Sequence, residues 1–239
     1  MCQDKTTFLR RFLFYFNVAA LKLVTVPLSR SIRGAEKLPA GACLIAANHR
    51  SLIDGILLVN ELNRVRRRSI HMIAYREPFA HWFYGPIMRI SGCLPFDRGL
   101  LESRVAVMRL ALGYLEAGEP VAFFPEAHLS RTDTMRRGRP GLALLALETG
   151  LPVVPVGLCG TERVLEPGTG RFHLRRAASV EIGAPLELTH LRKDFLEGDE
   201  AARAFAVEEA TTEVMRAIAS LSGQQYPHEP RRRRTHPRW

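Results

Sequence analysis

The chain has little cysteine, and its cysteines show no spacing that is typical of a metal site. Four occur among 239 residues, and no CxxC pair is present; they are Cys2, Cys43, Cys93 and Cys159. Two of them, Cys43 and Cys159, lie in apolar runs, which is typical of small buried hydrophobic side chains. The sequence therefore predicts no metal site, and it favours a reducing compartment.

A long apolar run free of charge is also missing. The most apolar N-terminal stretch, residues 8–28, is interrupted by Arg10, Arg11 and Lys22, whereas a membrane span needs about 18 uninterrupted apolar residues or more. No small-residue cleavage site follows it, so a secretory signal is not indicated. Its aromatic and basic residues are typical of a helix lying in the membrane interface. A helix packed into the core is the alternative.

Acidic residues are outnumbered. The chain has 24 Asp and Glu against 34 Lys and Arg, a net charge of +10, and five of the arginines lie in the last nine residues. This excess favours anionic partners such as lipid headgroups or phosphorylated substrates. Nucleic acid is not expected as a partner because no binding motif accompanies the charge. We expect an interfacial helix over residues 1–30, one domain over 31–222 and a basic disordered tail over 223–239.

Short apolar runs alternate with amphipathic segments after residue 27. The runs expected to form strands are residues 42–47, 70–75, 92–96, 120–124, 152–158 and 178–183. The segments expected to form helices are residues 51–65, 77–90, 101–118, 141–150 and 199–221. Strand and helix in alternation predict a single α/β domain with a mainly parallel central sheet flanked by helices. Pro155 lies within one expected strand and suggests an edge or a bulge there.

The segment NHRSLID, residues 48–54, follows the first of these strands. Ser51 and Asp54 fit the capping box that begins many helices, which requires no catalysis. The alternative is that the turn carries His49 back toward Asp54, so that the carboxylate orients the imidazole as a general base. No GxSxG nucleophile accompanies the pair, so the substrate itself would supply the hydroxyl.

Three later segments are also informative, and two of them place polar residues at strand ends, where ligands of open α/β sheets bind. In GCLPFDRG, Arg98 either holds a phosphate or pairs with Asp97. In FFPEAHLSR, Glu126 follows a buried strand. The segment GLPVVPVGL is a strand with two prolines.

Taken in order, the four segments resemble the glycerophospholipid acyltransferases, the 1-acylglycerol-3-phosphate O-acyltransferase-like enzymes. The family block N-H-x-S-x-x-D is matched by Asn48, His49, Ser51 and Asp54. Residues 92–98 resemble the G-x-x-F-x-D-R block with one extra residue. Residues 124–130 align with F-P-E-G-T-R-S, and residues 151–156 with a V-P-V-x-P-V strand. The resemblance covers about residues 35–185.

The resemblance implies an O-acyltransferase of phospholipid biosynthesis that moves a fatty acyl group from acyl-CoA or acyl-carrier protein to a glycerolipid hydroxyl. His49 would remove the hydroxyl proton and Asp54 would orient it. The remaining site residues, which bind substrate, would be Asn48, Ser51, Arg98, Glu126 and Arg131. The expected partners are a lysophospholipid acceptor, an acyl thioester donor and an anionic membrane surface at the cytoplasmic face. No cofactor is expected.

The third block departs from the family pattern. Gly, Thr and Arg of the family are replaced by Ala127, His128 and Leu129, so the basic residue that helps to hold the acceptor phosphate is missing. Either Arg131, or the pair Arg137 and Arg139, takes its place, or His128 serves a different hydroxylated lipid. A membrane-binding protein that has this fold but lacks turnover is the alternative function.

Overall fold

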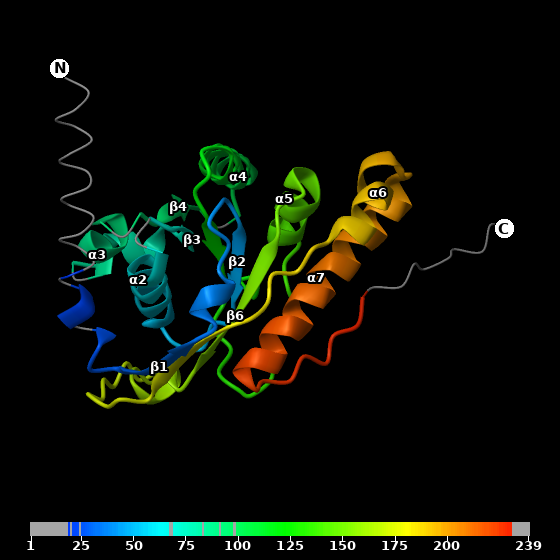
Figure 1. Ribbon diagram of the computed structural model, residues 1–239. Coiled ribbons are helices and arrows are strands. Elements are labelled where there is room, and N and C mark those ends of the chain that lie inside the picture. Colours follow the sequence, from blue (N-terminus) through cyan, green and yellow to red (C-terminus); the bar gives the residue numbers. More distant parts are fainter. Residues whose placement is uncertain are drawn as a thin grey trace, which may run out of the picture.

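The computed structural model describes residues 19, 21–23, 25–66, 69–82, 84–90, 92–97 and 99–230. Within these residues one sheet is formed, with the strand order β1-β7-β6-β2-β5-β3-β4 (Figure 1). Its strands are β1 Ser29–Arg33, β2 Leu44–Ala47, β3 His71–Tyr75, β4 Leu94–Phe96, β5 Val121–Phe123, β6 Val153–Cys159 and β7 Ala178–Ile182. Neighbouring strands are parallel except β6 and β7, which are antiparallel. The predicted single α/β domain with a mainly parallel sheet is confirmed.

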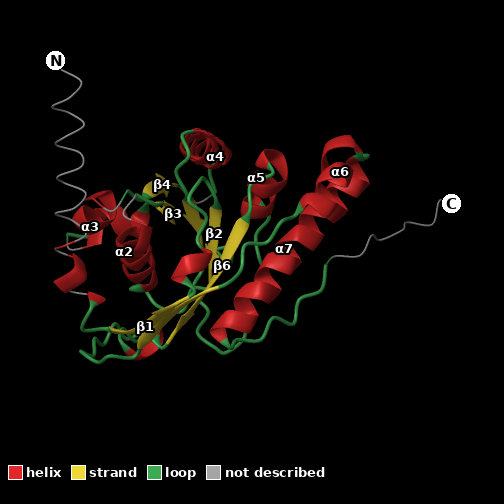
Figure 2. Ribbon diagram, in the orientation of Figure 1, coloured by secondary structure: helices red, strands yellow, loops and turns green. Residues whose placement is uncertain are grey.

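Helices cover both faces of the sheet (Figure 2). They are α2 Asp54–Arg66, α3 Tyr84–Ile90, α4 Leu101–Glu116, α5 Gly141–Thr149, α6 Thr189–Glu197 and α7 Glu200–Ser222, and short 3-10 turns lie at η1 Ala35–Lys37, η2 Glu77–Ala80 and η3 Thr161–Arg163. Apolar side chains of α2 form one core cluster with the sheet. Those of α4, α5, α6 and α7 form the cluster on the opposite face.

The strand β2 shows why its sequence is apolar at every position. Leu44 and Ala46 belong to the cluster beneath α5 and α7, whereas Ile45 and Ala47 belong to the cluster beneath α2. Because side chains alternate across a strand, a strand covered on both faces needs an unbroken apolar run. The same run places the polar turn that follows β2 at the carboxyl edge of the sheet.

The structure differs from the expected elements in three places. Residues 29–33 form the edge strand β1, although their sequence, SRSIR, is mostly polar. The helix expected over 77–90 is divided into η2 and α3. The strand β6 is not at an edge, since β7 and β2 flank it. Pro155 is tolerated in this inner strand because its nitrogen, which carries no hydrogen, faces the end of β7. The Pro155 carbonyl accepts a hydrogen bond there from the Gly183 N–H.

Both ends of the described chain pack against the domain. Leu21, Thr25 and Leu28 are buried, so the end of the expected interfacial segment also contributes to the core. At the other end, Gln225 bonds through its backbone to Asp133 and Met135, which holds part of the expected tail in place. Residues 1–18 and the arginine run at 231–239 lie outside the described residues. None of the described helices is both long enough and apolar enough to span a membrane.

Candidate active site

The turn between β2 and α2 brings His49 and Asp54 together. Nδ1 of His49 lies 2.9 Å from Oδ2 of Asp54. The same oxygen accepts the backbone N–H groups of Arg50 at 2.6 Å and Ser51 at 2.7 Å. Because a carboxylate oxygen can only accept, Nδ1 carries a hydrogen, and in the neutral imidazole Nε2 then has the lone pair. The imidazole is therefore in the tautomer that a general base requires.

Only half of the expected capping box is formed. Asp54 reaches back to the Ser51 N–H, as a capping box requires. The Ser51 hydroxyl does not cap the helix; it donates to the Leu165 carbonyl at 2.7 Å. Asp54 is fully buried and binds the backbone of the turn and the imidazole at once, so the contact to the turn and the contact to His49 come from one side chain.

The ring and the backbone of His49 are held independently. The imidazole stacks on the Phe124 ring with centroids 4.1 Å apart and planes 9° from parallel. The His49 N–H donates to Oε1 of Glu126 at 2.9 Å, and its carbonyl accepts the Ser130 N–H at 2.7 Å. The side chain remains 19% exposed, which leaves its outer edge open to a substrate.

Glu126 is a buried structural acceptor in this arrangement. It is 1% exposed, and besides the His49 N–H it accepts the Arg136 N–H at 2.7 Å and the Ser130 hydroxyl. Both oxygens are thus occupied by groups of the protein. The carboxylate joins the turn after β2 to the loop after β5.

Asn48 joins the same turn to the other side of the sheet. Its amide is buried and bonds both backbone groups of Leu158 in β6, accepting the N–H at 2.7 Å and donating to the carbonyl at 2.9 Å. It also donates to Oε1 of Gln224, just after α7, at 2.8 Å. The Asn48 side chain therefore faces β6 and Gln224 and not open space, and it holds the start of the turn that carries His49.

Arg131 lies at an apolar groove beside the turn. The groove has a volume of about 360 Å³ and is lined by Leu52, Leu129, Leu165 and the turn at residues 166–170, together with Arg131. Arg131 is exposed and forms no ion pair with any residue that the structure describes. Ser51 bonds to Leu165, which lines the groove, and Ser130 bonds to His49, so the groove is joined to the turn that carries the imidazole, while His49 itself is not among its lining residues.

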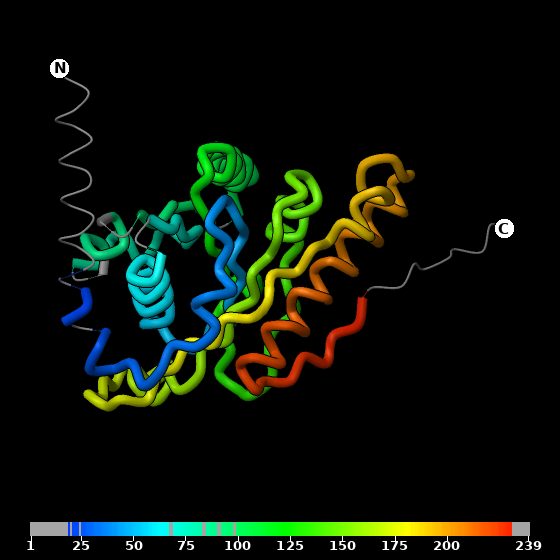
Figure 3. The backbone as a smooth tube through the Cα atoms, viewed as in Figure 1, coloured from blue at the N-terminus to red at the C-terminus, as the bar shows by residue number. Residues whose placement is uncertain are grey.

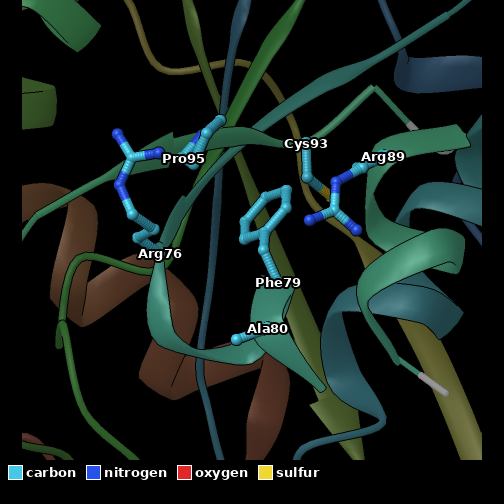
Figure 4. A pocket seen from close by; sticks show the side chains of 6 residues that line it. All are labelled: Arg76, Phe79, Ala80, Arg89, Cys93 and Pro95. Carbon is cyan, nitrogen blue, oxygen red and sulfur yellow. The ribbon is translucent and has the colours of Figure 1, made fainter. Parts of the chain in front are cut away.

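A second pocket, of about 410 Å³, lies at the β3–β4 edge. Figure 4 shows the Phe79 ring between the side chains of Arg76 and Arg89, with Ala80, Cys93 and Pro95 completing the lining. Nε of Arg76 donates to Asp97 at 2.7 Å, so Asp97 has a partner other than Arg98. Arg98 itself lies outside the described residues. Burial raises the pKa of the Cys93 thiol to about 12, which leaves it protonated and unsuited to act as a nucleophile.

The altered third block has an unusual backbone. Ala127 has φ of 59° and is the one described non-glycine residue with positive φ, at the position where the resembling family has Gly. The His128 ring lies 5.9 Å from the Tyr75 ring at the end of β3. Arg137, expected as a substitute for the missing basic residue, pairs instead with Glu208 at 2.9 Å.

Several contributors to the site were not predicted from the sequence. Gln224 is 176 residues from Asn48 and Leu165 is 114 residues from Ser51, and no local pattern indicates either contact. Arg76 could have been noticed as a basic residue directly after an expected strand, at the same edge as His49. Among the described residues the structure shows no cluster of three side chains able to hold a metal ion.

Comparison with known proteins gives one family match. The family model described as "Acyltransferase" matches residues 29–159, which is more than half of the chain. This range includes both partners of the His49–Asp54 pair and the whole of the altered third block.

Relatives with related names are similar over part of the chain. A chloroplastic 1-acyl-sn-glycerol-3-phosphate acyltransferase of Brassica napus is 29% identical over 58% of this chain and 39% of its own length. A 1-acyl-sn-glycerol-3-phosphate acyltransferase of Saccharomyces cerevisiae is 27% identical over 67% of this chain and 52% of its own length. The chain thus spans about two fifths to one half of these relatives.

A solved structure has the same fold. The crystal structure of the 1-acyl-sn-glycerophosphate acyltransferase PlsC from Thermotoga maritima superposes with a TM-score of 0.59, at 22% identity, over 90% of this chain and 82% of that one. The likeness extends over almost the whole domain, including the sheet whose carboxyl edge carries His49.

Proposed function

The chain belongs to the acyltransferase family, and we propose that it transfers a fatty acyl group from an acyl thioester to a hydroxyl of a glycerolipid. The observation that carries this proposal is the pair of His49 and Asp54, at 2.9 Å. A fully buried carboxylate orients the imidazole, while its outer edge remains open at the carboxyl end of β2. This is the geometry of a general base that acts on a hydroxyl supplied by the substrate.

The proposed reaction needs no nucleophile from the protein. Nε2 of His49 takes the proton of the acceptor hydroxyl as the oxygen bonds to the thioester carbonyl carbon. The tetrahedral intermediate collapses by breaking the carbon–sulfur bond, and the imidazolium returns the proton to the departing sulfur. The products are an ester and a free thiol. Asp54 stabilises the transient imidazolium, and we expect no cofactor besides the thioester.

The acceptor is proposed to be lysophosphatidate or another lysophospholipid, because several relatives are named 1-acyl-sn-glycerol-3-phosphate acyltransferases. The basic residue missing from the third block leaves two arginine sites for the acceptor phosphate. Arg131 lies at the apolar groove that is joined through Leu165 and Ser51 to the turn carrying His49, whereas Arg76 and Arg89 line the pocket at the β3–β4 edge. The groove suits an acyl chain with an adjacent phosphate, so we assign the acceptor to Arg131.

The central test measures acyl transfer by mass spectrometry. Purified protein is given a panel of lysophospholipids with either acyl-CoA or acyl-carrier protein as donor. We expect His49→Ala to lower turnover about 10³-fold, within the range for removal of a general base. His190→Ala is the control, because His190 is an exposed histidine of α6 that pairs with Glu213 on α7, away from the His49 turn. Equal turnover by a folded His49→Ala protein would refute the role of His49.

The acceptor assignment is tested by Arg131→Gln. We expect KM for lysophosphatidate to rise about tenfold or more while KM for monoacylglycerol, which lacks the phosphate, stays the same. Arg76→Gln with Arg89→Gln is the comparison variant. If only that variant raises KM for lysophosphatidate, the phosphate binds at the β3–β4 edge instead.

We also propose that the protein is peripheral on a membrane, at its cytoplasmic face, with residues 1–18 in the interface. The composition of this segment and the lipid acceptor support this proposal. Deletion of residues 1–18 should reduce binding to anionic vesicles, and it spares Leu21, Thr25 and Leu28, which are buried in the domain. Equal co-sedimentation with and without these residues would refute it. If the protein binds vesicles but transfers no acyl group from either donor, the result would instead support the alternative function, a membrane-binding protein that has this fold but lacks turnover.

A further inference from the structure

The connection between β6 and β7 contains a small hairpin, residues 164–173. Leu165 and Phe172 form an antiparallel bridge, the His173 N–H donates to the Val164 carbonyl at 2.7 Å, and the Glu166 N–H donates to the Arg171 carbonyl at 2.9 Å. The first arm is anchored, because Val164 and Leu165 belong to the core cluster beneath α2. The second arm continues to residue 176, and we call residues 164–176 the β6–β7 hairpin.

The second arm is exposed along its whole length. All six residues of the segment RFHLRR, 171–176, are exposed, with Phe172 at 54% and Leu174 at 75%. The segment has three arginines and no acidic residue. Neither Arg171 nor Arg175 forms an ion pair with a residue in the described part of the chain. Large apolar side chains presented to solvent beside unpaired cations indicate a surface for an anionic amphiphile.

The β6–β7 hairpin is joined to the active-site turn. Leu165 lines the groove that contains Arg131, and its carbonyl accepts the Ser51 hydroxyl in the active-site turn. At the hairpin tip, a Cβ added to Gly168 would lie 4.0 Å from the guanidinium carbon of Arg131. The exposed arm therefore lies on the rim of the groove assigned to the acceptor.

The β6–β7 hairpin also lies beside the segment that leads out of the N-terminal region. Nε of Arg176 donates to the Ser29 carbonyl at 3.0 Å, and the Ala178 N–H donates to the Leu28 carbonyl. In Figure 3 this yellow-green part of the tube runs next to the blue part that precedes β1. Leu23 and Val26, which come shortly before it in the chain, are themselves exposed at 80% and 42%.

We propose that the β6–β7 hairpin is a second membrane contact, which binds an anionic lipid surface and seats the rim of the groove on it. Phe172 and Leu174 insert among the headgroups, and Arg171 and Arg175 bind lipid phosphates. The contact rests on the proposed membrane association and adds to it an element that is distant in the sequence from residues 1–18. It supplies a direct path for a lysolipid from the bilayer to Arg131.

The test is co-sedimentation of the full chain with phosphatidylcholine vesicles, with and without phosphatidylglycerol. We expect Phe172→Ser with Leu174→Ser to weaken binding about tenfold, and Arg171→Gln with Arg175→Gln to weaken it about thirtyfold, at about 1 kcal/mol for each arginine. The arginine effect should appear only with phosphatidylglycerol and should fade at high salt. All four side chains are exposed, so these variants should fold.

Matched controls use exposed residues at the far end of the domain. Leu196→Ser with Phe205→Ser removes apolar side chains of comparable exposure from α6 and α7, and Arg109→Gln with Lys193→Gln removes two exposed cations. Both should bind vesicles within about twofold of the wild type, a change smaller than the loss of one surface cation. His49→Ala should also bind normally, so that a failure of the proposed chemistry is distinguishable from a failure of this contact.

A second measurement reports insertion directly. In Phe172→Trp, a blue shift of the added tryptophan fluorescence and quenching by brominated lipid are expected on addition of anionic vesicles. Unchanged vesicle binding by both hairpin variants would overturn the proposal, and so would a tryptophan spectrum that does not respond. If the hairpin variants lose binding to duplex DNA but keep binding to vesicles, the proposal is also overturned, and the hairpin is a nucleic-acid surface instead.

Discussion

At the scale of single residues, the position of His49 depends on groups that never meet a substrate. Asp54 orients the imidazole, Phe124 sets its plane, and Glu126 and Ser130 hold its backbone on both sides. Glu126 is the side chain on which most of these contacts converge, because it accepts from both loops at the edge of the sheet. It should therefore act as a positioning residue rather than as a ligand of the headgroup.

The variant Glu126→Gln tests this role. One oxygen becomes an N–H donor that faces a backbone N–H, either of His49 or of Arg136. We expect the free energy of unfolding to fall by about 2 kcal/mol, the cost of an unsatisfied buried donor, and kcat to fall with little change in KM. Glu208→Gln is the control, since its pair with Arg137 is partly exposed and worth about 1 kcal/mol or less. A pure rise in KM would show that Glu126 binds the substrate instead.

Ala127 carries a local strain that can be relieved. Its φ of 59° lies in the left-handed region, where an L-residue with a Cβ is disfavoured by about 1–2 kcal/mol. Ala127→Gly removes this strain, but glycine also adds entropy to the unfolded chain, which offsets part of the gain, so the free energy of unfolding should rise by about 1 kcal/mol or less. In Ala106→Gly, on the exposed face of α4, the same change should lower it by about 1 kcal/mol. Urea denaturation measures the free energy of unfolding of both variants. A loss of stability in both would contradict the strain at Ala127.

At the scale of elements, the site depends on how closely α7 lies against the sheet. Asn48 bonds to Gln224 just after this helix, and β6 approaches it through Gly157. A Cβ added to Gly157 would lie 2.5 Å from the backbone carbon of Leu221. Glycine is thus required in β6 because it allows a helix backbone to pack directly on the strand.

Gly157→Ala is expected to destabilise the domain by about 2 kcal/mol, as overpacking does in other cores, and to lower turnover by moving Leu158 away from Asn48. Gly113→Ala is the opposite case. Gly113 lies within α4 with nothing within 4 Å of an added Cβ, so alanine should stabilise the helix by about 1 kcal/mol. Thermal melts of the two variants should move in opposite directions. A Gly157→Ala protein as stable as the wild type would mean that α7 can move away from β6 without lowering the stability of the domain.

The sequence predicted the buried elements better than the edges and the contacts between them. Strands such as β2 and β6 are apolar on both faces, and that pattern is visible without a structure. The edge strand β1 is short and polar, so no hydrophobic period marks it. His49 and Asp54 were predicted as a pair because a turn before the expected helix can carry the imidazole back to the carboxylate. The anchoring of Asn48 by Gln224 and of Ser51 by Leu165 arises only when distant segments fold together.

At the scale of the whole molecule, burial also affects groups outside the active site. Burial raises the pKa of Cys43, Cys93 and Cys159, and it raises the pKa of Tyr226 against smaller opposing effects of the Gly138 N–H and Arg137. All four are neutral acids that the fold withdraws from water, in four separate segments of the chain. Each loses its proton more readily in the unfolded chain than in the folded domain.

The fold should therefore become less stable in alkali. The pKa of Cys93 is about 12 in the folded protein against 9.0 for the free group. Below pH 9 both states keep the proton and this thiol has no effect on stability. Above pH 9 the unfolded chain binds fewer protons than the folded one, so the free energy of unfolding falls as pH rises toward 12. We expect Cys93→Ala to lose less stability than the wild type between about pH 8 and pH 10.5, measured by urea denaturation at each pH. The difference between the two slopes of unfolding free energy against pH removes the titrations that both proteins share. Equal slopes would show that the fold does not raise the pKa of Cys93.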